Sequence, residues 1–387
     1  MTTELAQSKK VTGSQAFACL VDARSQKTVE GLLNVVEPGY LIDTFLKNPP
    51  IDFDAFEVNS GTEVSTPAFK ADFDLLTTLD DDAKQLKDAV GRFPFLKRFL
   101  VYPSVFVGTT ATEYSNYPDC KDYKSVIANL LQEMRKRGAQ LLIVKDIPQN
   151  SPLLNPLENE KANLLIEECA NAGFLLVEGQ ALAFVPINFS SIDEYMARLS
   201  KSRRKEFRKK LKESGDVTVK ILHCGAPEFF DEGFIDIIYR MYENVYQQSE
   251  IHFDVLSKEF FKGVLQSTAG GGKVFCYELN GKLIGYNICF VHDNRLIDKY
   301  VGFVYPDARD ANLYFMSWFY NLEYALKNNL SCYIAGWTDP AVKAALGASF
   351  TMTRHAVFIR NPILRAILTP FKHLFESDSN WMEKQEK

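Results

Sequence analysis

The sequence has few histidines and lacks the regular spacings that bind metals. Its five histidines show neither HxxxH nor HExxH spacing, and its seven cysteines form no CxxC pair. Structural zinc sites are typically built from such pairs. We therefore expect no metal site. We also expect the scattered, odd number of cysteines to be reduced thiols, as is typical of the cytoplasm.

Long apolar runs and an excess of positive charge are missing too. No stretch approaches the roughly 20 apolar residues that a membrane-spanning helix requires, and residues 1–10 lack the apolar core of a signal peptide. The formal net charge is −5, which argues against DNA as a partner but leaves room for a local basic patch. The sequence thus favours a cytoplasmic protein with no transmembrane span.

What is present fits a globular chain of more than one domain. The 387 residues are 46% hydrophobic and 24% charged, and two domains are the natural expectation for this length. We expect a first unit over residues 1–190, in which 1–90 are poorly defined, and a basic linker helix over 191–215. A second unit over 216–361 and an amphipathic tail over 362–387 would follow.

The first unit carries alternating strand and helix patterns after residue 98. Strands are predicted over 99–107 and 141–145, and helices over 124–137 and 158–172, each helix ending at a glycine. Two further strands are predicted over 174–178 and 182–187. This alternation of strands and helices is typical of an α/β unit.

The most conspicuous charge run lies between the two units. Nine basic residues occur from Arg198 to Lys212, and the apolar residues among them keep near-helical spacing. The pattern predicts one amphipathic helix with a basic outer face. It is either a solvated linker or a cradle for phosphates, in which Arg203 and Arg204 are the candidate contacts.

The second unit has a more legible order of elements. A strand over 217–222 precedes helices over 227–248 and 257–268, the latter with Ser257 as N-cap. Three antiparallel strands follow over 273–279, 282–291 and 295–303, and Asn280-Gly281 marks the first hairpin. A helix over 312–328, a strand over 331–336, a short helix over 341–346 and a strand over 350–360 complete the unit.

This order, and several local strings, resemble a known family. The element order is similar to that of the GNAT acyltransferases. The string from Tyr195 to Lys205 resembles the Y-x-x-x-L-S-x-x-R-R-K signature of FemAB-like proteins, and G-W-x-x-P-x-x-K-x-x-x-G recurs from Gly336 to Gly347. The resemblance implies a mixed-sheet α/β fold of two tandem GNAT-like acyl-CoA N-acyltransferase units, with the active cleft mostly in the second.

In GNAT proteins the fourth and fifth strands splay apart, and the next helix N-terminus holds the donor's pyrophosphate. Here the corresponding loop runs over 305–312. It makes Arg309, Asp310, Ala311, Asn312 and Tyr314 the candidate donor contacts. The loop has no glycine and carries two aspartates, which departs from the glycine-rich pattern of GNAT loops.

Candidate catalytic and pocket residues follow from the predicted strands. Asp298 and Tyr300 lie two residues apart on one strand, so they are expected to share a face. Asp298 would accept the amine proton or anchor the amine, and Tyr300 would donate to the leaving group. Lys343 matches the family's lysine and joins them as a catalytic candidate. Trp337, at a strand end, and His355 are the candidate substrate-pocket residues.

These residues favour transfer of an acyl group from acyl-CoA, as a co-substrate, to a small or amino-acid-like amine, with no tightly bound cofactor. Transfer from aminoacyl-tRNA, with the basic helix holding RNA, is the alternative. A binding module with a degenerate GNAT fold is a third. The tail over 362–375 either docks on the protein's own core or makes peripheral membrane contact.

Overall fold

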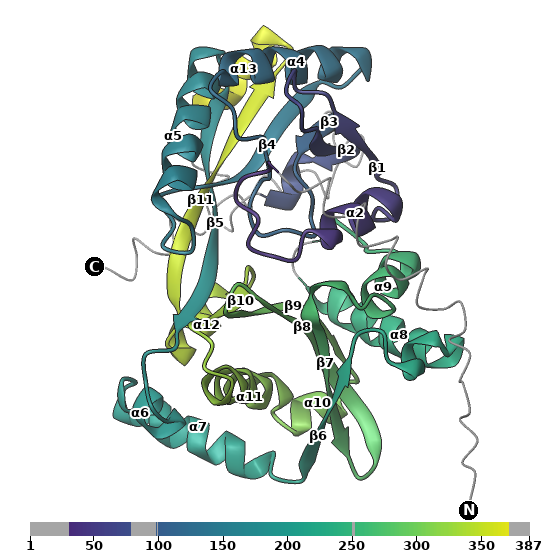
Figure 1. The fold of residues 1–387 in the computed structure, drawn as a ribbon, viewed down its shortest axis with the longest axis vertical. Helices are drawn as coiled ribbons and strands as arrows, with labels where there is room; N and C mark the ends of the chain where they lie inside the picture. Colours follow the sequence, from purple (N-terminus) through teal and green to yellow (C-terminus); the bar gives the residue numbers. More distant parts are fainter. Residues whose placement is uncertain (1–30, 79–97, 99, 250–251, 371–387) are drawn as a thin grey trace, which may run out of the picture.

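One mixed sheet of 11 strands runs through the whole molecule (Figure 1). The computed structural model describes residues 31–78, 98, 100–249 and 252–370. Within them the strand order is β1-β2-β3-β4-β11-β5-β10-β9-β8-β7-β6. Helices cover both faces of this sheet, so the core consists of several apolar layers and not one.

The first unit forms one end of the sheet. Its strands are β1 (Asp54–Val58), β2 (Thr66–Asp74), β3 (Val101–Val107), β4 (Leu141–Pro148) and β5 (Leu175–Pro186). Its helices are α2 (Tyr40–Lys47), α4 (Tyr123–Lys136) and α5 (Pro156–Asn171), with a 3-10 turn η1 (Leu75–Thr78). Asn155 and Glu158 cap α5 reciprocally, which satisfies two backbone donors at its start.

The second unit forms the other end. Its strands are β6 (Val217–His223), β7 (Gly272–Leu279), β8 (Lys282–His292), β9 (Arg295–Phe303), β10 (Cys332–Gly336) and β11 (Ser349–Ile359). Its longer helices are α8 (Glu232–Gln248), α9 (Lys258–Leu265) and α11 (Leu313–Lys327). The shorter ones are α10 (Asp307–Asp310), α12 (Pro340–Leu346) and α13 (Pro362–Leu368), with 3-10 turns η4 (Pro227–Phe230) and η5 (Ala269–Gly271).

The two units exchange their last strands. β11, expected to close a second unit over 216–361, lies between β4 and β5 of the first unit. In return β5 pairs with β10 of the second unit. The long strands β5 and β11 therefore join the two ends of the molecule (Figure 1). A boundary near residue 190 therefore divides the sequence into two segments, but the strands of both segments belong to one sheet.

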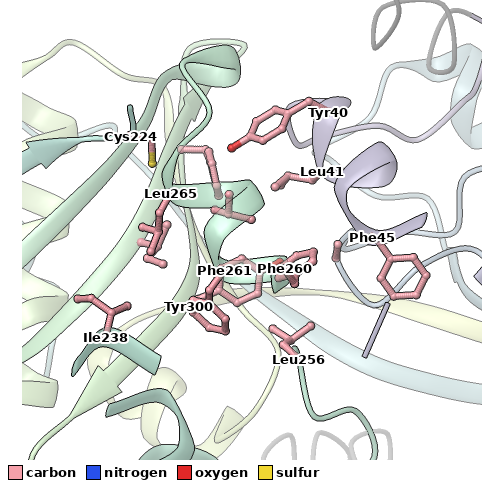
Figure 2. Close-up of a cluster of buried hydrophobic side chains, with 14 of the residues drawn as sticks. Tyr40, Leu41, Phe45, Cys224, Ile238, Leu256, Phe260, Phe261, Leu265 and Tyr300 are labelled. Atoms are coloured by element: carbon pink, nitrogen blue, oxygen red, sulfur yellow. The ribbon is translucent and has the colours of Figure 1, made fainter. Parts of the chain in front are cut away.

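The main apolar cluster is shared by both units. Helix α2 of the first unit packs on α9 of the second, and Tyr40, Leu41 and Phe45 belong to the same apolar cluster as Phe260 and Phe261 (Figure 2). On the other faces, α4 and α5 cover the strands of the first unit, while α7 and α11 cover those of the second. The exchange of strands is thus matched by a common core.

Local signals in the sequence located most elements correctly. The Asn280-Gly281 hairpin is present, with both residues at positive φ. The Ser257 hydroxyl accepts a hydrogen bond from the backbone N–H of Phe260, as predicted for the N-cap of α9. Helix α2 and the strands β1 and β2 were not predicted, because residues 1–90 show only weak hydrophobic periodicity.

Three predictions about elements were wrong. The helix predicted over 227–248 is the 3-10 turn η4 and the helix α8, because Asp231 between them is extended. The strands predicted over 174–178 and 182–187 are one strand, β5, because a bulge at residues 179–180 lets it continue. The single basic helix predicted over 191–215 is two helices, α6 (Ile192–Ala197) and α7 (Lys201–Glu213). Ser200 is extended and caps α7 through Arg203 N–H, so the helix begins anew there.

The described part of the tail docks on the protein and also exposes apolar groups. Leu364 and Leu368 of α13 pack against the shared cluster, whereas the Ile363 and Ile367 side chains are exposed. Residues 371–375 of the predicted amphipathic segment lie outside the described residues. Among the helices described here, none combines the length and apolarity needed to cross a membrane.

Candidate active site

Two parallel strands diverge at the middle of the second unit. β9 and β10 pair over three positions, from Arg295–Cys332 to Ile297–Ile334. Beyond Ile297, β9 continues along β8 only, so a gap opens between the two strands. We call this gap the second wedge. After β9 and the short α10 comes α11, which contacts β9 through the hydrogen bond from Asn321 to Asp298.

The second wedge opens into a cavity between the two units, here called the central cavity. Its volume is about 570 Å³. Asp298 and Lys299 of β9 and Trp337 after β10 line it from the second unit, and Glu113, Lys145 and His355 line it opposite them. A cavity of this size, partly apolar and with convergent polar groups, is typical of a small-molecule site.

The first unit contains an equivalent strand pair, but its wedge is filled. β3 and β4 run parallel from Ser104–Leu141 to Val107–Val144 and then diverge. The loop over 108–118 occupies the gap and is almost entirely buried. Ser115 N–H donates to the Asp146 carbonyl at 3.1 Å, and Lys145 Nζ donates to the Thr109 carbonyl at 2.9 Å. Only the second wedge therefore remains open among the described residues.

Asp298 is held by several hydrogen-bond donors at the floor of the second wedge. Asn287 Nδ2 donates to both of its carboxylate oxygens at 3.0 and 2.8 Å. Asn321 Nδ2 and the Tyr333 hydroxyl each donate to Oδ2 at 3.0 Å. Burial raises the pKa of Asp298, while Asn287, Tyr333 and the nearby Lys343 charge oppose that rise. The carboxylate is thus fixed in place but retains basic character.

Asp298 and Tyr300 do not share a face, contrary to the prediction. The β8–β9 register shifts so that Cys289 faces Asp298 while Ile288 faces Tyr300, which leaves Lys299 as an extra residue. This bulge reverses the alternation of side chains. Tyr300 therefore packs against Phe260 and Phe261 of α9 (Figure 2), while Asp298 turns toward α11.

The bulge directs Lys299 into the first unit. Its Nζ lies 2.7 Å from Glu113 Oε1 and 3.6 Å from Glu37 Oε1, and all three side chains are buried. Glu37 Oε1 also accepts the Glu113 N–H at 2.5 Å. Burial would lower the pKa of Lys299, but the two carboxylates outweigh it and hold this pKa above its ordinary value. Burial raises the pKa of Glu37 to about 7 against the opposing Lys299 charge.

A second charged cluster lies at paired bulges of the first unit. Lys145 and Asp146 form a bulge on β4 opposite His355 of β11, and Asp146 has a φ of 50°. Lys145 Nζ lies 2.5 Å from Asp146 Oδ2. His355 Nδ1 accepts the Asp146 N–H at 3.0 Å, so the neutral ring carries its proton on Nε2. Burial lowers the pKa of His355, which favours that neutral form.

Lys343 and Trp337 close the end of β10. Lys343 Nζ donates to the carbonyls of Ala335 at 2.7 Å and Gly336 at 3.1 Å, and also to that of Trp337. These contacts satisfy carbonyls that the end of a strand leaves unpaired. Lys343 therefore shapes the wedge, while Trp337 and Tyr314 form parts of the cavity wall.

The loop over 305–312 lies away from the central cavity. It folds into α10, and the N–H groups of Ala308 to Asn312 all donate to carbonyls within residues 304–309. Lys282 Nζ lies 2.8 Å from Asp307 Oδ2. Arg309 is exposed, donates to Gln248 Oε1 at 3.0 Å and lies over the Tyr305 ring. Few groups in this loop are left to bind a pyrophosphate.

The basic helix α7 packs on α11 through Phe207, which contacts Phe315 and Phe319. Its basic side chains lie mostly on the outer face. Arg204 Nη1 donates to the Ala197 carbonyl at 2.9 Å, whereas Arg203 is exposed and has no acidic partner among the described residues. Neither arginine lines the central cavity.

The structure brings together half of the predicted site residues. Asp298, Tyr300, Tyr314, Trp337, Lys343 and His355 all line the central cavity. Arg203, Arg204, Arg309, Asp310, Ala311 and Asn312 do not. In the described ranges no group of three or more His, Cys, Asp or Glu side chains could hold a metal ion.

The sequence interpretation missed several charged residues of the cavity. Glu113 lies in the loop over 108–118, which reads as an ordinary polar loop although it is buried. Lys299 was not predicted because a regular alternation of side chains places Asp298 and Tyr300 on the cavity face and Lys299 on the opposite face. Asp254 lies in the connection between α8 and α9. A carboxylate between aromatic and apolar residues, Phe253 and Val255, was the one signal that could have indicated it.

Comparison with solved structures gives the fold. The C-terminal domain of a putative lysylphosphatidylglycerol synthetase from Agrobacterium fabrum is 12% identical, covers 90% of this chain and 94% of its own, and has a TM-score of 0.52. A protein of unknown function from Bacteroides thetaiotaomicron is 10% identical, and its match covers 87% of this chain and 97% of its own, with a TM-score of 0.50. A tandem GNAT protein from the clavulanic acid biosynthesis pathway is 12% identical, and its match covers 90% of this chain and 97% of its own, with a TM-score of 0.46.

The predicted mixed α/β fold is confirmed. No protein of curated function matches the chain in sequence. The sequence model of the FemAB-like family, described as peptidoglycan biosynthesis/recognition, matches residues 158–386, which is more than half of the chain. The family resemblance predicted from the string at Tyr195–Lys205 is thereby confirmed, and the chain belongs to the FemAB-like family.

Proposed function

We propose that the protein is an N-acyltransferase that transfers an aminoacyl group from aminoacyl-tRNA to an amine in the central cavity. The observation that carries the proposal is the second wedge, which opens into a cavity lined by carboxylates from both units. An amine acceptor is a cation until it loses a proton, so a carboxylate-lined cavity favours its binding. The family description supports an amino-acid-like acceptor, such as the amine of a peptidoglycan peptide.

The reaction needs alignment more than a dedicated nucleophile. The amine nitrogen forms a bond with the acyl carbon, the ester bond to the ribose oxygen breaks, and one proton moves from nitrogen to that oxygen. Holding both reactants in one cavity makes this step effectively unimolecular. The fixed Asp298 cluster and the carbonyls gathered by Lys343 give the second wedge preorganised polar groups.

The donor end of the site supports an aminoacyl ester more than acyl-CoA. In the loop over 305–312 the backbone donors of Ala308 to Asn312 are already used, and the side chains include two aspartates. The outer face of α7, by contrast, presents Lys201, Arg203 and Lys205 to solvent. These exposed cations suit an extended polyanion such as tRNA, whose binding depends on neutralising many phosphates.

An acyl-CoA donor is the second candidate, and the second wedge itself favours it. Three paired positions followed by diverging strands leave backbone groups of β9 free on one side. In GNAT-type enzymes such groups bind the pantetheine arm. An acyl-CoA bound in this way would place its pyrophosphate near Arg309, where the folded loop has few free N–H groups to bind it.

Thermal unfolding with each donor tests the proposal. We would heat the protein with CoA, acetyl-CoA, a long-chain acyl-CoA or bulk tRNA, at low and moderate salt. A ligand that binds the native state raises the unfolding temperature. We expect a rise with tRNA that shrinks as salt increases, and a smaller rise in an Arg203→Glu/Lys205→Glu variant.

A matched variant separates the two donors. Arg309→Ala changes the one cation of the loop over 305–312 and leaves α7 intact. A rise with acyl-CoA that disappears in Arg309→Ala would replace the aminoacyl donor with acyl-CoA. If no donor raises the unfolding temperature, the proposed transferase activity is wrong and a binding module is the better account.

A further inference from the structure

Five carboxylates line the central cavity, and four of them already have strong partners. Glu113 pairs with Lys299 and Asp146 with Lys145, at 2.7 and 2.5 Å. Glu178 pairs with Arg354 and accepts a bond from Gln149 at 2.6 Å. Asp298 accepts its bonds from Asn287, Asn321 and Tyr333.

Asp254 is the exception among the described residues. Among the described residues, no basic group forms an ion pair with its carboxylate within 4 Å, and the Thr110 hydroxyl lies near enough to lower its pKa. Lys145 and Lys299 act on it only from a distance, since each is engaged by another acid. The central cavity thus contains one carboxylate that has no ion-pair partner in the part of the chain that the structure describes.

The backbone around Asp254 is fixed by both units. The Tyr242 hydroxyl donates to the Asp254 carbonyl at 3.4 Å and accepts the Leu256 N–H at 3.0 Å. Ile51 N–H, in the first unit, donates to the Val255 carbonyl at 2.8 Å. The Phe253 ring contacts Phe106 at 5.2 Å between centroids. The backbone that carries Asp254 is therefore held in place by contacts with both units.

An uncompensated carboxylate in an enclosed space has a cost, because burial disfavours the charged form. Such a cost is typical of a functional position, where a ligand supplies the missing charge. Several titratable side chains surround Asp254: Lys145 on β4, Lys299 and Tyr300 on β9, and Tyr242 and Tyr246 on α8. Those that are cations at neutral pH are already paired, and the tyrosines are neutral.

We propose that Asp254 binds the ammonium group of the acceptor and takes up its proton, so that the enzyme selects acceptors with a cationic amine. This inference rests on the proposed function and names its acceptor class. The proton moves from the ammonium nitrogen to an Asp254 oxygen, which leaves a nucleophilic amine. As the amide forms, the nitrogen loses a second proton to the leaving ribose oxygen, which becomes a hydroxyl. Asp254 then releases the first proton to solvent, so charge and atoms balance.

A binding measurement tests the inference without a donor. Wild-type protein is heated with n-hexylamine, with its neutral isostere hexan-1-ol or with hexanoate, at equal concentration and ionic strength. We expect n-hexylamine to raise the unfolding temperature most, because an ion pair with Asp254 adds to the apolar contact. In Asp254→Asn this preference should disappear, with about tenfold weaker apparent affinity for n-hexylamine.

Three variants keep the result interpretable. Asp254→Glu should retain the preference for the amine, because it restores the charge. Asp236→Asn, on the outer side of α8, removes an exposed carboxylate paired with Lys258 and should leave the preference intact. Asp254→Asn should fold at least as stably as the wild type, since it removes a half-buried carboxylate that has no ion-pair partner among the described residues.

The inference is overturned if Asp254→Asn keeps the wild-type preference, or if wild type does not prefer the amine to hexan-1-ol. Neither outcome depends on acyl transfer. Failure of the donor experiment with an intact amine preference would count against the proposed reaction alone.

Discussion

Lys299, Glu113 and Glu37 bury one positive and two negative groups where the two units meet. Lys299 comes from the bulge of β9, and the two acids come from the first unit. The second carboxylate oxygens of both acids have no hydrogen-bond partner among the described residues. At the residue scale this cluster is therefore sensitive to any loss of its cation.

We expect Lys299→Met to destabilise the protein by about 3–5 kcal/mol, because it leaves buried carboxylates without a countercharge. Chemical denaturation at neutral pH measures this loss. Adding Glu113→Gln and Glu37→Gln to Lys299→Met should recover most of it, since no unpaired charge then remains. A triple variant as unstable as Lys299→Met would mean that the loss comes from packing.

Glu37 should make stability depend on pH. Its pKa rises from 4.5 to about 7 on folding, so between these values the folded state binds the extra proton. The contribution of Glu37 to the free energy of unfolding is therefore largest below pH 4.5, and it is lost as the pH rises through 7. That rise corresponds to about 3 kcal/mol.

Unfolding free energies at several pH values between 5 and 8 check this for wild type and Glu37→Gln. We expect the difference between the two proteins to shift in favour of Glu37→Gln as pH increases. A difference that stays constant over this range would show that Glu37 does not change its protonation there.

At the scale of elements, local patterns located helices and hairpins, and nonlocal contacts decided the rest. The β7–β8 hairpin follows from Asn280-Gly281, because its turn needs two residues at positive φ. Helix α2 is stabilised by packing on α9, more than 200 positions away in sequence, so its own sequence indicates little.

The candidate active site, like the fold, was predicted in part from the sequence. Trp337 was found because it follows the end of a predicted strand, and Asp298 because it lies on the predicted strand that borders the wedge. The bulge at Lys299 has no sequence signature, so the orientations of Asp298 and Tyr300 were assigned by a regular alternation that the strand does not keep. Asp254 and Glu113 lie in connections whose positions only the folded chain defines.

The contact of α2 with α9 provides an element-scale test. A Cβ at Gly263 would lie 2.7 Å from Thr44 Cγ2, so the two helices approach closely only because this side chain is absent. We expect Gly263→Ala to destabilise the protein by about 1–3 kcal/mol, despite the higher helix propensity of alanine.

Denaturation of Gly233→Ala provides the comparison, because that helical glycine would meet only the Asp231 side chain, at 3.3 Å. It should be neutral or slightly stabilising. Thr44→Ser, which removes the obstructing methyl group, should restore the stability of Gly263→Ala. Equal effects of the two alanine substitutions would contradict the proposed close approach.

At the scale of the whole molecule, the exchange of β5 and β11 makes the two units interdependent. β5 lies between β10 and β11, and β11 lies between β4 and β5. A chain cut near residue 190 loses pairing on both sides of these strands. The central cavity also needs both units, because its walls come from each.

We therefore expect residues 1–190 and 191–387, expressed separately, each to lack a cooperative unfolding transition, whereas the full chain shows one. Circular dichroism and calorimetry measure this. Co-expression of the two pieces should restore soluble, folded protein through the shared sheet and core. A cooperative transition in either isolated piece would show that the units fold alone, contrary to the interlocked topology.

The central claim is that an aminoacyl group passes from tRNA to an amine held between the two units. The most direct measurement follows labelled amino acids from a charged tRNA pool into an amide that survives mild alkali, with lysine and lysine-containing peptides as acceptors. The account predicts amide formation with wild type, and strong loss of it in Asp254→Asn but not in Asp236→Asn. Amide formation from acyl-CoA with thiol release, while charged tRNA stays inert, would contradict it.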